Sequence, residues 1–298
     1  MSRTAAEIAT QPACWRRAAE AAADFDGLPR PGERVAVTGC GTSWFMAIAY
    51  AALREAAGQG ETDAFASSEF PAGRAYDRVV AITRSGTTTE VLELLGALRG
   101  SVPTTALTAD PKTPVMEAAD AVAVLDFADE ESVVQTRFAT TALAFLRAGL
   151  GDLSALGVKP VAEAAVDAEL AVTEPLPEPV LGAEQWTFLG RGWTYGLALE
   201  AGLKMREAAG AWTESYPAME YRHGPISITG PGRVAWMFGT LPDGLAADVD
   251  RVGGHLVARD TDPLADLIRA QRLAVALAES KGYDPDRPRN LTRSVILA

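Results

Sequence analysis

Residues that bind metals or form disulfides are scarce in this chain. Two histidines and two cysteines occur among 298 residues, and Cys14 and Cys40 form no Cys-x-x-Cys pair. So few His and Cys side chains argue against a dedicated zinc site. We therefore expect no metal and no other cofactor.

Positive charge and long apolar runs are also lacking. The net charge is −12, which argues against binding to nucleic acid or to anionic lipid. No apolar run approaches the roughly 20 residues that span a bilayer. Arg3, Glu7, Arg16 and Arg17 interrupt any secretory apolar segment near the start. We expect a cytoplasmic protein. A small anionic substrate remains possible, because backbone N–H groups at a helix start can bind an anion.

The sequence contains an internal repeat. RVAVTGCGTSWFMAIAYAALREAAG (34–58) and WTFLGRGWTYGLALEAGLKMREAAG (186–210) both run from an apolar strand through a Gly-x-Gly turn into a helix. Gly39 aligns with Gly190 and Gly41 with Gly192, and the motif REAAG recurs after a slip of one residue. Two such units about 150 positions apart indicate a duplicated domain.

Each half continues with alternating strands and helices, which predicts an α/β fold with parallel sheets. Expected strands are 78–83, 102–109, 233–240 and 255–260, and expected helices are 1–26, 87–100 and 244–254. We expect two tandem domains, each a flavodoxin-like sheet with helices on both faces. The predicted division is an N-terminal helix (1–26), a first domain (27–172), a proline-rich linker (173–182) and a second domain with a C-terminal tail (183–298). The tail is too rich in proline for a helix before Asn290.

The Gly-x-Gly turn of GCGTSW resembles a dinucleotide fingerprint only weakly. Trp44 stands where that fingerprint has its third glycine, so an NAD site is poorly supported.

The segment ITRSGTTTE (82–90) is more informative, because it places five hydroxyls around one glycine between a strand and a helix. Hydroxyls and free N–H groups at a helix start suit a phosphate. An alternative interpretation is a capping box, with Thr87 as N-cap and Glu90 three residues later. The P-loop pattern for ATP is absent.

Five motifs in order carry a resemblance over nearly the whole chain: GCGTS, TRSGTTTEV, LGRGxxYGLALEAGLKMRE, YRHGP and DPDRPRNLTRSV. They resemble the SIS (sugar isomerase) family, particularly the isomerase half of glucosamine-6-phosphate synthase, tagatose-6-phosphate ketose/aldose isomerases and sugar-phosphate deaminases. The resemblance implies that the first domain binds the substrate phosphate. The residues it implies are Gly41, Thr42, Ser43, Thr83, Arg84, Ser85 and Thr88.

The resemblance also implies the catalytic groups. Glu207 would be the general base, His223 would open the sugar ring from a neighbouring subunit, and Lys204 would contact the sugar oxygens. From the residues alone, Glu207 fits a solvated helix charge better than a catalytic base. A surface charge is the alternative for Lys204, and a core histidine is the alternative for His223. Arg293 stands where the synthase has a lysine, and arginine cannot form a Schiff base with a ketose. It remains a candidate cation beside the enediolate oxygens.

The expected function is isomerisation or deamination of a hexose or hexosamine 6-phosphate, by proton transfer through a cis-enediol or enolamine. The synthase's glutaminase half is not found in this sequence, so we do not expect glutamine-dependent synthesis. The alternative is a non-catalytic sugar-phosphate-binding regulator. A shared site implies a homodimer, and Ile8, Trp15 and Ala19 offer an apolar stripe for its interface.

Overall fold

A computed structural model describes residues 1–297, which form two compact units. The N-terminal sheet unit comprises residues 10–131, 135–163 and the C-terminal segment from Thr292. The C-terminal sheet unit comprises residues 1–9, 132–134 and 164–291. Helix α7 (Val161–Thr173) begins in the former and continues in the latter. Both units have an α/β fold with a parallel sheet, as the alternating strands and helices predict.

The N-terminal sheet unit is built on five parallel strands in the order β2-β1-β3-β4-β5. The strands are β1 (Val35–Gly39), β2 (Thr62–Ala66), β3 (Arg78–Ile82), β4 (Thr104–Thr108) and β5 (Ala121–Val124). The strand order reverses between β1 and β3, which makes this pair the topological switch point. Gly39 pairs with Ile82, so the carboxyl ends of these two strands lie side by side.

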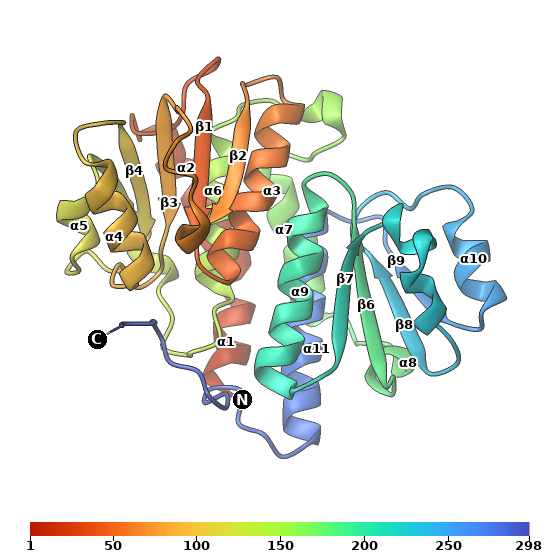
Figure 1. The fold of residues 1–298 in the computed structure, drawn as a ribbon. Coiled ribbons are helices and arrows are strands. Elements are labelled where there is room, and N and C mark those ends of the chain that lie inside the picture. Colours follow the sequence, from red (N-terminus) through yellow and green to blue (C-terminus); the bar gives the residue numbers. More distant parts are fainter. Residues whose placement is uncertain (298) are drawn as a thin grey trace. The chain divides into compact units, whose positions relative to one another are not determined.

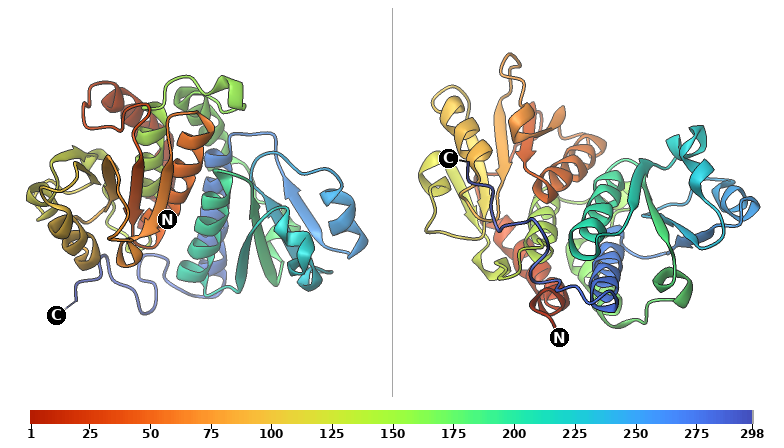
Figure 2. Two further views of the ribbon diagram at one scale, coloured as in Figure 1. Left: turned by 45° about the horizontal axis from the view of Figure 1, so that its top comes forward. Right: turned by 60° about the horizontal axis from the view of Figure 1, so that its bottom comes forward.

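Helices cover both faces of this sheet. They are α2 (Gln11–Ala23), α3 (Thr42–Ala56), α4 (Thr89–Leu98), α5 (Val115–Ala118) and α6 (Arg137–Ala148), with short 3₁₀ turns η1 (Ser67–Glu69), η2 (Asp126–Ala128) and η3 (Ser154–Leu156). Val91, Leu95 and Val115 of α4 and α5 pack against Ala81 and Ala106 of the sheet. Figure 2 shows α4 and α5 on one face and α3 on the other.

The C-terminal sheet unit has four parallel strands in the order β7-β6-β8-β9. They are β6 (Gln185–Gly190), β7 (Thr213–Pro217), β8 (Arg233–Met237) and β9 (His255–Ala258). The helices are α1 (Arg3–Ala9), α8 (Glu178–Leu181), α9 (Thr194–Ala209), α10 (Leu245–Arg251) and α11 (Pro263–Ser280), with 3₁₀ turns η4 (Glu220–His223) and η5 (Pro225–Ile228). Helices α9 and α11 pack side by side (Figure 1).

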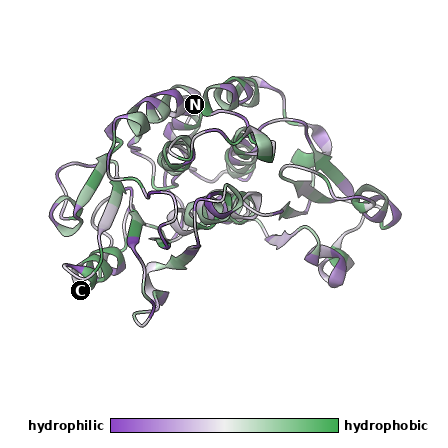
Figure 3. Cartoon of the chain, turned by 90° about the horizontal axis from the view of Figure 1, so that it is seen from above, coloured by the Kyte–Doolittle hydropathy of each residue, from purple (hydrophilic) through white to green (hydrophobic). Residues whose placement is uncertain are grey.

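Apolar contacts hold this second sheet to its helices. Leu245 and Val249 of α10 belong to one buried cluster with Leu189, Ala235 and Met237 of the sheet. In Figure 3 the strands of both units are mainly green to white, in keeping with their buried positions. Parallel strands covered on both faces read as continuous apolar runs, which explains why they were predictable from sequence.

The repeated glycines have the same conformations in both units. A Cβ on Gly39 would lie 2.6 Å from Ser43 Cβ, and one on Gly190 would meet the Thr194 carbonyl, so only glycine permits this close strand–helix approach. Gly41 and Gly192 have φ of 55° and 57°. The order β2-β1-β3-β4 also has its counterpart in β7-β6-β8-β9. Both Gly-x-Gly turns therefore use a left-handed second glycine, although Gly41 is itself the N-cap of α3 whereas Trp193 follows Gly192 as the N-cap of α9.

The N-terminal segment differs from the prediction of one helix over 1–26. The chain forms α1 and α2, with Thr10 between them and Pro12 in the first turn of α2, where a missing N–H costs little. The expected apolar stripe for a dimer is also wrong. Ile8 and Trp15 belong to different units, and both are buried within the chain. Trp15 donates a hydrogen bond to Thr140 of α6 at 3.0 Å.

Residues 281–297 form no helix or strand. Among residues 1–297, no helix is long and apolar enough to cross a membrane.

Candidate functional site

All seven predicted phosphate-binding residues follow one of the two strands that flank the switch point. β1 leads through Gly41 to Thr42 and Ser43 at the start of α3, and β3 leads through residues 83–88 to α4. Ligands of open α/β sheets bind outside the carboxyl ends of the strands at this point. The N-terminal sheet unit thus brings all seven residues to one region.

Gly86 fixes the turn between β3 and α4. Its φ is +63°, and a Cβ there would lie 2.8 Å from Val115 Cγ1 and would clash with the side chain of Thr113. The left-handed conformation and the crowding together require glycine. The turn therefore places the hydroxyl-bearing residues on either side of Gly86 in fixed positions.

The hydroxyls after β3 form a cluster, which we call the hydroxyl loop (residues 83–88). Ser85 Oγ lies 3.5 Å from Thr88 Oγ1 and accepts a hydrogen bond from the Thr87 amide at 3.3 Å. Thr83 is buried, and its Oγ1 has no hydrogen-bond partner among residues 1–297. An unpaired buried hydroxyl is costly, and a bound ligand or a water molecule would supply the missing partner.

The capping-box interpretation of this loop is wrong. The N-cap of α4 is Thr88 rather than Thr87, and its side chain makes no capping hydrogen bond. The amides at the start of α4 are therefore not satisfied by the local side chains that the pattern indicated.

Arg84 is held by a buried ion pair that the sequence analysis did not anticipate. Its Nη1 lies 3.5 Å from Glu130 Oε2, and both side chains are almost fully buried. Glu130 also accepts hydrogen bonds from the amides of Thr136 and Arg137 at the start of α6. Glu130 stands in a run of acidic residues that resembles a solvated loop, so its sequence context gives no signal of this role.

The predicted acid–base residues of the C-terminal sheet unit lie on α9. Lys204 is buried, lies 3.5 Å from the fully buried Glu200 and donates a hydrogen bond to Glu207. The three residues are spaced i, i+4 and i+7, so they share one helix face. That spacing is the signal by which Glu200 could have been found in the sequence.

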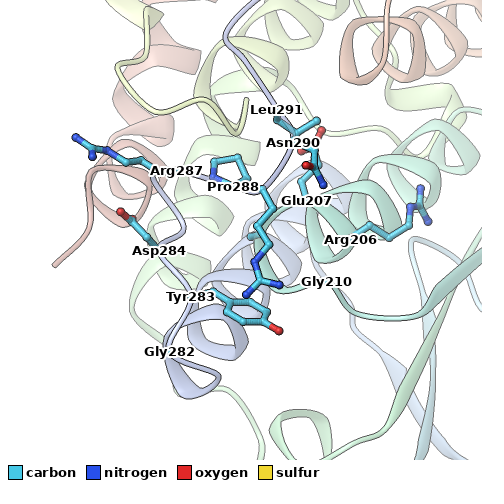
Figure 4. A pocket seen from close by; sticks show the side chains of 12 residues that line it. Arg206, Glu207, Gly210, Gly282, Tyr283, Asp284, Arg287, Pro288, Asn290 and Leu291 are labelled. Atoms are coloured by element: carbon cyan, nitrogen blue, oxygen red, sulfur yellow. The ribbon is translucent and has the colours of Figure 1, made fainter.

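Glu207 lines a cavity of about 640 Å³. The other lining residues are Arg206, Ala208, Gly210, Gly282, Tyr283, Asp284 and 287–291. Figure 4 shows Glu207 beside Asn290, while Arg206 and Arg287 point away on opposite sides. Arg206 donates a hydrogen bond to Thr213 Oγ1 at 3.0 Å, and partial desolvation lowers the pKa of its guanidinium although the residue as a whole is exposed. A carboxylate beside a cavity can exchange a proton with a bound molecule.

His223 ends η4, and its side chain is exposed. The neighbouring Arg222 holds this turn by an ion pair to Asp248 at 2.7 Å, and this bond lowers the pKa of Asp248. The alternative interpretation of His223 as a core histidine is therefore wrong. An exposed imidazole is accessible to another molecule.

Arg293 lies in the N-terminal sheet unit, whereas Lys204, Glu207 and His223 lie in the C-terminal sheet unit. The guanidinium of Arg293 bonds the Asp129 carboxylate and the Glu130 carbonyl. Among residues 1–297, no group of three His, Cys, Asp or Glu side chains is arranged to hold a metal.

The fold is one found in solved structures of proteins named for sugar-phosphate chemistry. The structure of glucosamine-6-phosphate deaminase from Thermotoga maritima matches with a TM-score of 0.79 at 22% identity, covering 99% of this chain and 100% of that one. The C-terminal domain of glucosamine-fructose-6-phosphate aminotransferase from Francisella tularensis matches with a TM-score of 0.78 at 20% identity, covering 97% and 98%.

In sequence, the chain is similar to the isomerizing glutamine–fructose-6-phosphate aminotransferases. The protein from Sulfurisphaera tokodaii is 28% identical over 295 residues, which cover 89% of this chain and 50% of that protein. The chain spans about half the length of the curated relatives it matches. No family model matches the chain. These comparisons confirm the resemblance predicted from the motifs.

Proposed function

We propose that this chain is an enzyme that isomerises or deaminates a hexose or hexosamine 6-phosphate. The observation that carries the proposal is the hydroxyl loop at the switch point of the N-terminal sheet, with the buried, unpartnered hydroxyl of Thr83. Serine and threonine hydroxyls together with amides at a helix start bind a phosphate without a metal. The names of the relatives and structural neighbours support the same substrate class.

Thr42, Ser43, Thr83, Ser85 and Thr88 would hold the phosphate, with Gly41 allowing a close backbone approach. Arg84 would add positive charge while Glu130 fixes its position. In the proposed reaction, His223 opens the sugar ring, and the Glu207 carboxylate removes the proton from C2 of the open-chain aldose. Glu207, whose proton exchanges with water in the enediol state, then delivers a proton to C1, while a proton passes from O2 to O1, and the ketose results. Lys204 and Arg293 would stabilise the enediolate oxygens. In a deaminase, the same enolisation and protonation at C1 give an imine at C2, and water hydrolyses this imine to the ketose and ammonia.

We also propose that the two sheets are tandem SIS domains. Their boundaries follow the two compact units and not the predicted ones, because residues 1–9 and 164–172 belong to the C-terminal sheet unit and the segment from Thr292 belongs to the N-terminal sheet unit. The repeated glycine conformations and strand order support a duplication. A cytoplasmic location fits the substrate, because a charged phosphate ester crosses a bilayer poorly.

A homodimer with shared sites is part of the proposal, and the exposed His223 is consistent with it. Subunit complementation tests it. An inactive Glu207→Gln variant and an inactive His223→Ala variant are mixed and allowed to exchange subunits. Shared sites restore part of the activity, because a mixed dimer has one site without either substitution. A mixture that stays inactive after exchange, shown by mass, would place both residues in one subunit's site.

The reaction is tested by incubating the protein with a panel of hexose and hexosamine 6-phosphates. Isomerase activity interconverts an aldose and a ketose, whereas deaminase activity also releases ammonia or a substituted amine. Binding without turnover would indicate a sugar-phosphate sensor. Neither binding nor turnover of any member would contradict the proposal.

A further inference from the structure

The imidazole of His223 has no contact of its own that fixes its direction. His223 is the last residue of η4 and is exposed, and within residues 1–297 its ring makes no hydrogen bond or ion pair. A side chain of this kind takes its position from the backbone that carries it. The anchoring of η4 therefore decides where the ring of His223 lies.

The side chain that anchors this turn to another element is Arg222. Its Nε donates a hydrogen bond to Asp248 Oδ2 at 2.7 Å, and its Nη2 donates one to the Asp243 carbonyl at 2.5 Å. Asp248 lies in the first turn of α10, and Asp243 lies in the loop between β8 and α10. Figure 1 shows the turns after β7, in teal, beside α10. Because the donors of a guanidinium form a rigid fork, two bonds to one segment fix the direction of Arg222.

Burial of neighbouring side chains holds the turn on both sides of His223. Tyr221 is fully buried in an apolar cluster that includes residues of α10, and its hydroxyl shares a hydrogen bond with Thr229. Ile226 packs against the same cluster. The chain is thus fixed two residues before His223 and three residues after it. Arg222 is the anchor closest to His223, directly before it in the chain.

Stability alone explains the ion pair of Arg222 poorly. Both side chains are partly exposed, Arg222 by 25% and Asp248 by 23%, and ion pairs at the surface contribute little to stability. Arg251 of α10 also lies 2.9 Å from Asp248, so the carboxylate has a second cationic partner. The contact that only Arg222 supplies is the connection between α10 and the turn that carries His223.

We propose that Arg222 is a positioning residue for His223. The inference rests on the proposed function, in which His223 opens the sugar ring. A proton-transferring group must lie within hydrogen-bond reach of the reacting oxygen, and a small misplacement slows the reaction. By fastening the residue next to His223 to α10, Arg222 limits the orientations of the imidazole. The proposed phosphate site lies in the other unit, so Arg222 acts on the chemical step and leaves substrate binding unchanged.

Three full-length variants test this role. Arg222→Met removes both bonds to the α10 segment and keeps an apolar stem. Arg222→Lys keeps a positive charge for Asp248 but lacks the fork of donors. Arg251→Met is the matched control, because it removes the other cation from Asp248 without touching η4. Each variant is assayed with the sugar phosphate that the panel identifies. NMR relaxation then measures the order of the backbone amides at His223 and Gly224, with those of β9 as an internal reference.

Arg222→Met is expected to lower kcat about ten-fold and to leave KM within about two-fold of the parent. Its order parameters at His223 and Gly224 should fall from about 0.85 to below about 0.6, while those of β9 stay unchanged. Arg222→Lys should keep kcat within about three-fold of the parent, because one bond to Asp248 remains. Arg251→Met should behave as the parent does.

A parent-like kcat or a parent-like order at His223 in Arg222→Met would overturn the inference and leave the proposed function in place. A raised KM with unchanged kcat would assign Arg222 to substrate binding, and would also overturn it. If Arg222→Met does not fold, Asp248→Asn replaces it, since this change weakens the same contact with little change in volume. It should lower kcat and the order at His223 in the same direction, and no effect on either would contradict the inference. If the parent turns over no sugar phosphate, the proposed function is wrong and the inference falls with it.

Discussion

Lys204 donates a hydrogen bond to Glu207 from one turn earlier on α9, and this bond links a buried ammonium to a carboxylate that lines a cavity. The ammonium also lies 3.5 Å from Glu200, which is fully buried. Glu207 keeps 18% of its side chain exposed. Lys204 thus holds the Glu207 carboxylate at the cavity, and the Glu200 carboxylate balances the charge of the ammonium inside the C-terminal sheet unit.

Replacing Lys204 by methionine should destabilise the C-terminal sheet unit. Lys204→Met deprives the buried Glu200 of an ion-pair partner, and losing one member of such a pair costs about 3 kcal/mol. Urea unfolding of the variant, with Lys112→Met as an exposed-lysine control, measures the loss. Adding Glu200→Gln should restore more than half of the lost stability. A double variant no more stable than Lys204→Met alone would argue against the ion pair.

Removing the charge of Glu130 should weaken phosphate binding. Glu130→Gln leaves Arg84 buried without its carboxylate and removes a charged acceptor from the start of α6. We expect at least a ten-fold loss of affinity for inorganic phosphate and a loss of stability of about 1–3 kcal/mol. Calorimetry and urea unfolding measure the two effects. Asp126 is exposed, and Asp126→Asn is the control. Equal phosphate affinity and equal stability of the two variants would contradict the role of Glu130 in positioning Arg84.

An alanine at Gly86 should disturb the hydroxyl loop. Gly86→Ala forces a Cβ onto a backbone with φ of +63° and against the Thr113 side chain. We expect a stability loss of about 1–3 kcal/mol together with weaker phosphate binding. Gly73→Ala is the matched control, because a Cβ at Gly73 meets no atom within 4 Å. Thermal unfolding of both variants measures the loss of stability. A Gly86→Ala chain as stable as the Gly73→Ala chain would refute the prediction.

Asp120 should contribute stability that depends on pH. Hydrogen bonds from the Thr104 amide, at 2.8 Å, and from the Thr104 hydroxyl lower the pKa of Asp120 below that of a free aspartate. Its stabilising effect is therefore present above about pH 4 and disappears as the pH falls through the lowered folded-state pKa. Urea unfolding of the parent and Asp120→Asn at several pH values between about 2 and 7 measures it. The difference in unfolding free energy between the parent and Asp120→Asn should become smaller as the pH falls. A difference that does not depend on pH would exclude a contribution from the lowered pKa of Asp120.

The sequence predicted the parts of the fold that depend on local chemistry. Gly39 and Gly41 mark the turn from β1 to α3, and the hydroxyls around Gly86 mark the turn from β3 to α4, because backbone conformation restricts those positions to glycine. The break at Thr10 was missed, since an alanine-rich segment satisfies helical periodicity on both sides of it.

Contacts between residues far apart in the chain could not be predicted. The partnership of Arg84 with Glu130 joins two loops 46 positions apart. Ser294 reaches the hydroxyl loop across 209 positions from Ser85, although its segment looks like an ordinary polar tail. Both depend on tertiary packing, which residue spacing does not encode. The roles of Glu207, His223, Lys204 and Arg293 stay predictions.

The central claim is that Glu207 transfers a proton at the carbon next to the sugar carbonyl. Its most direct test is incubation with the hexose or hexosamine 6-phosphate that the panel identifies, in deuterated water, with isotope incorporation followed by NMR. The account predicts deuterium at C1 or C2 with the parent chain and none with Glu207→Gln, while inorganic phosphate binds both chains equally. Incorporation by Glu207→Gln at the parent rate would contradict it.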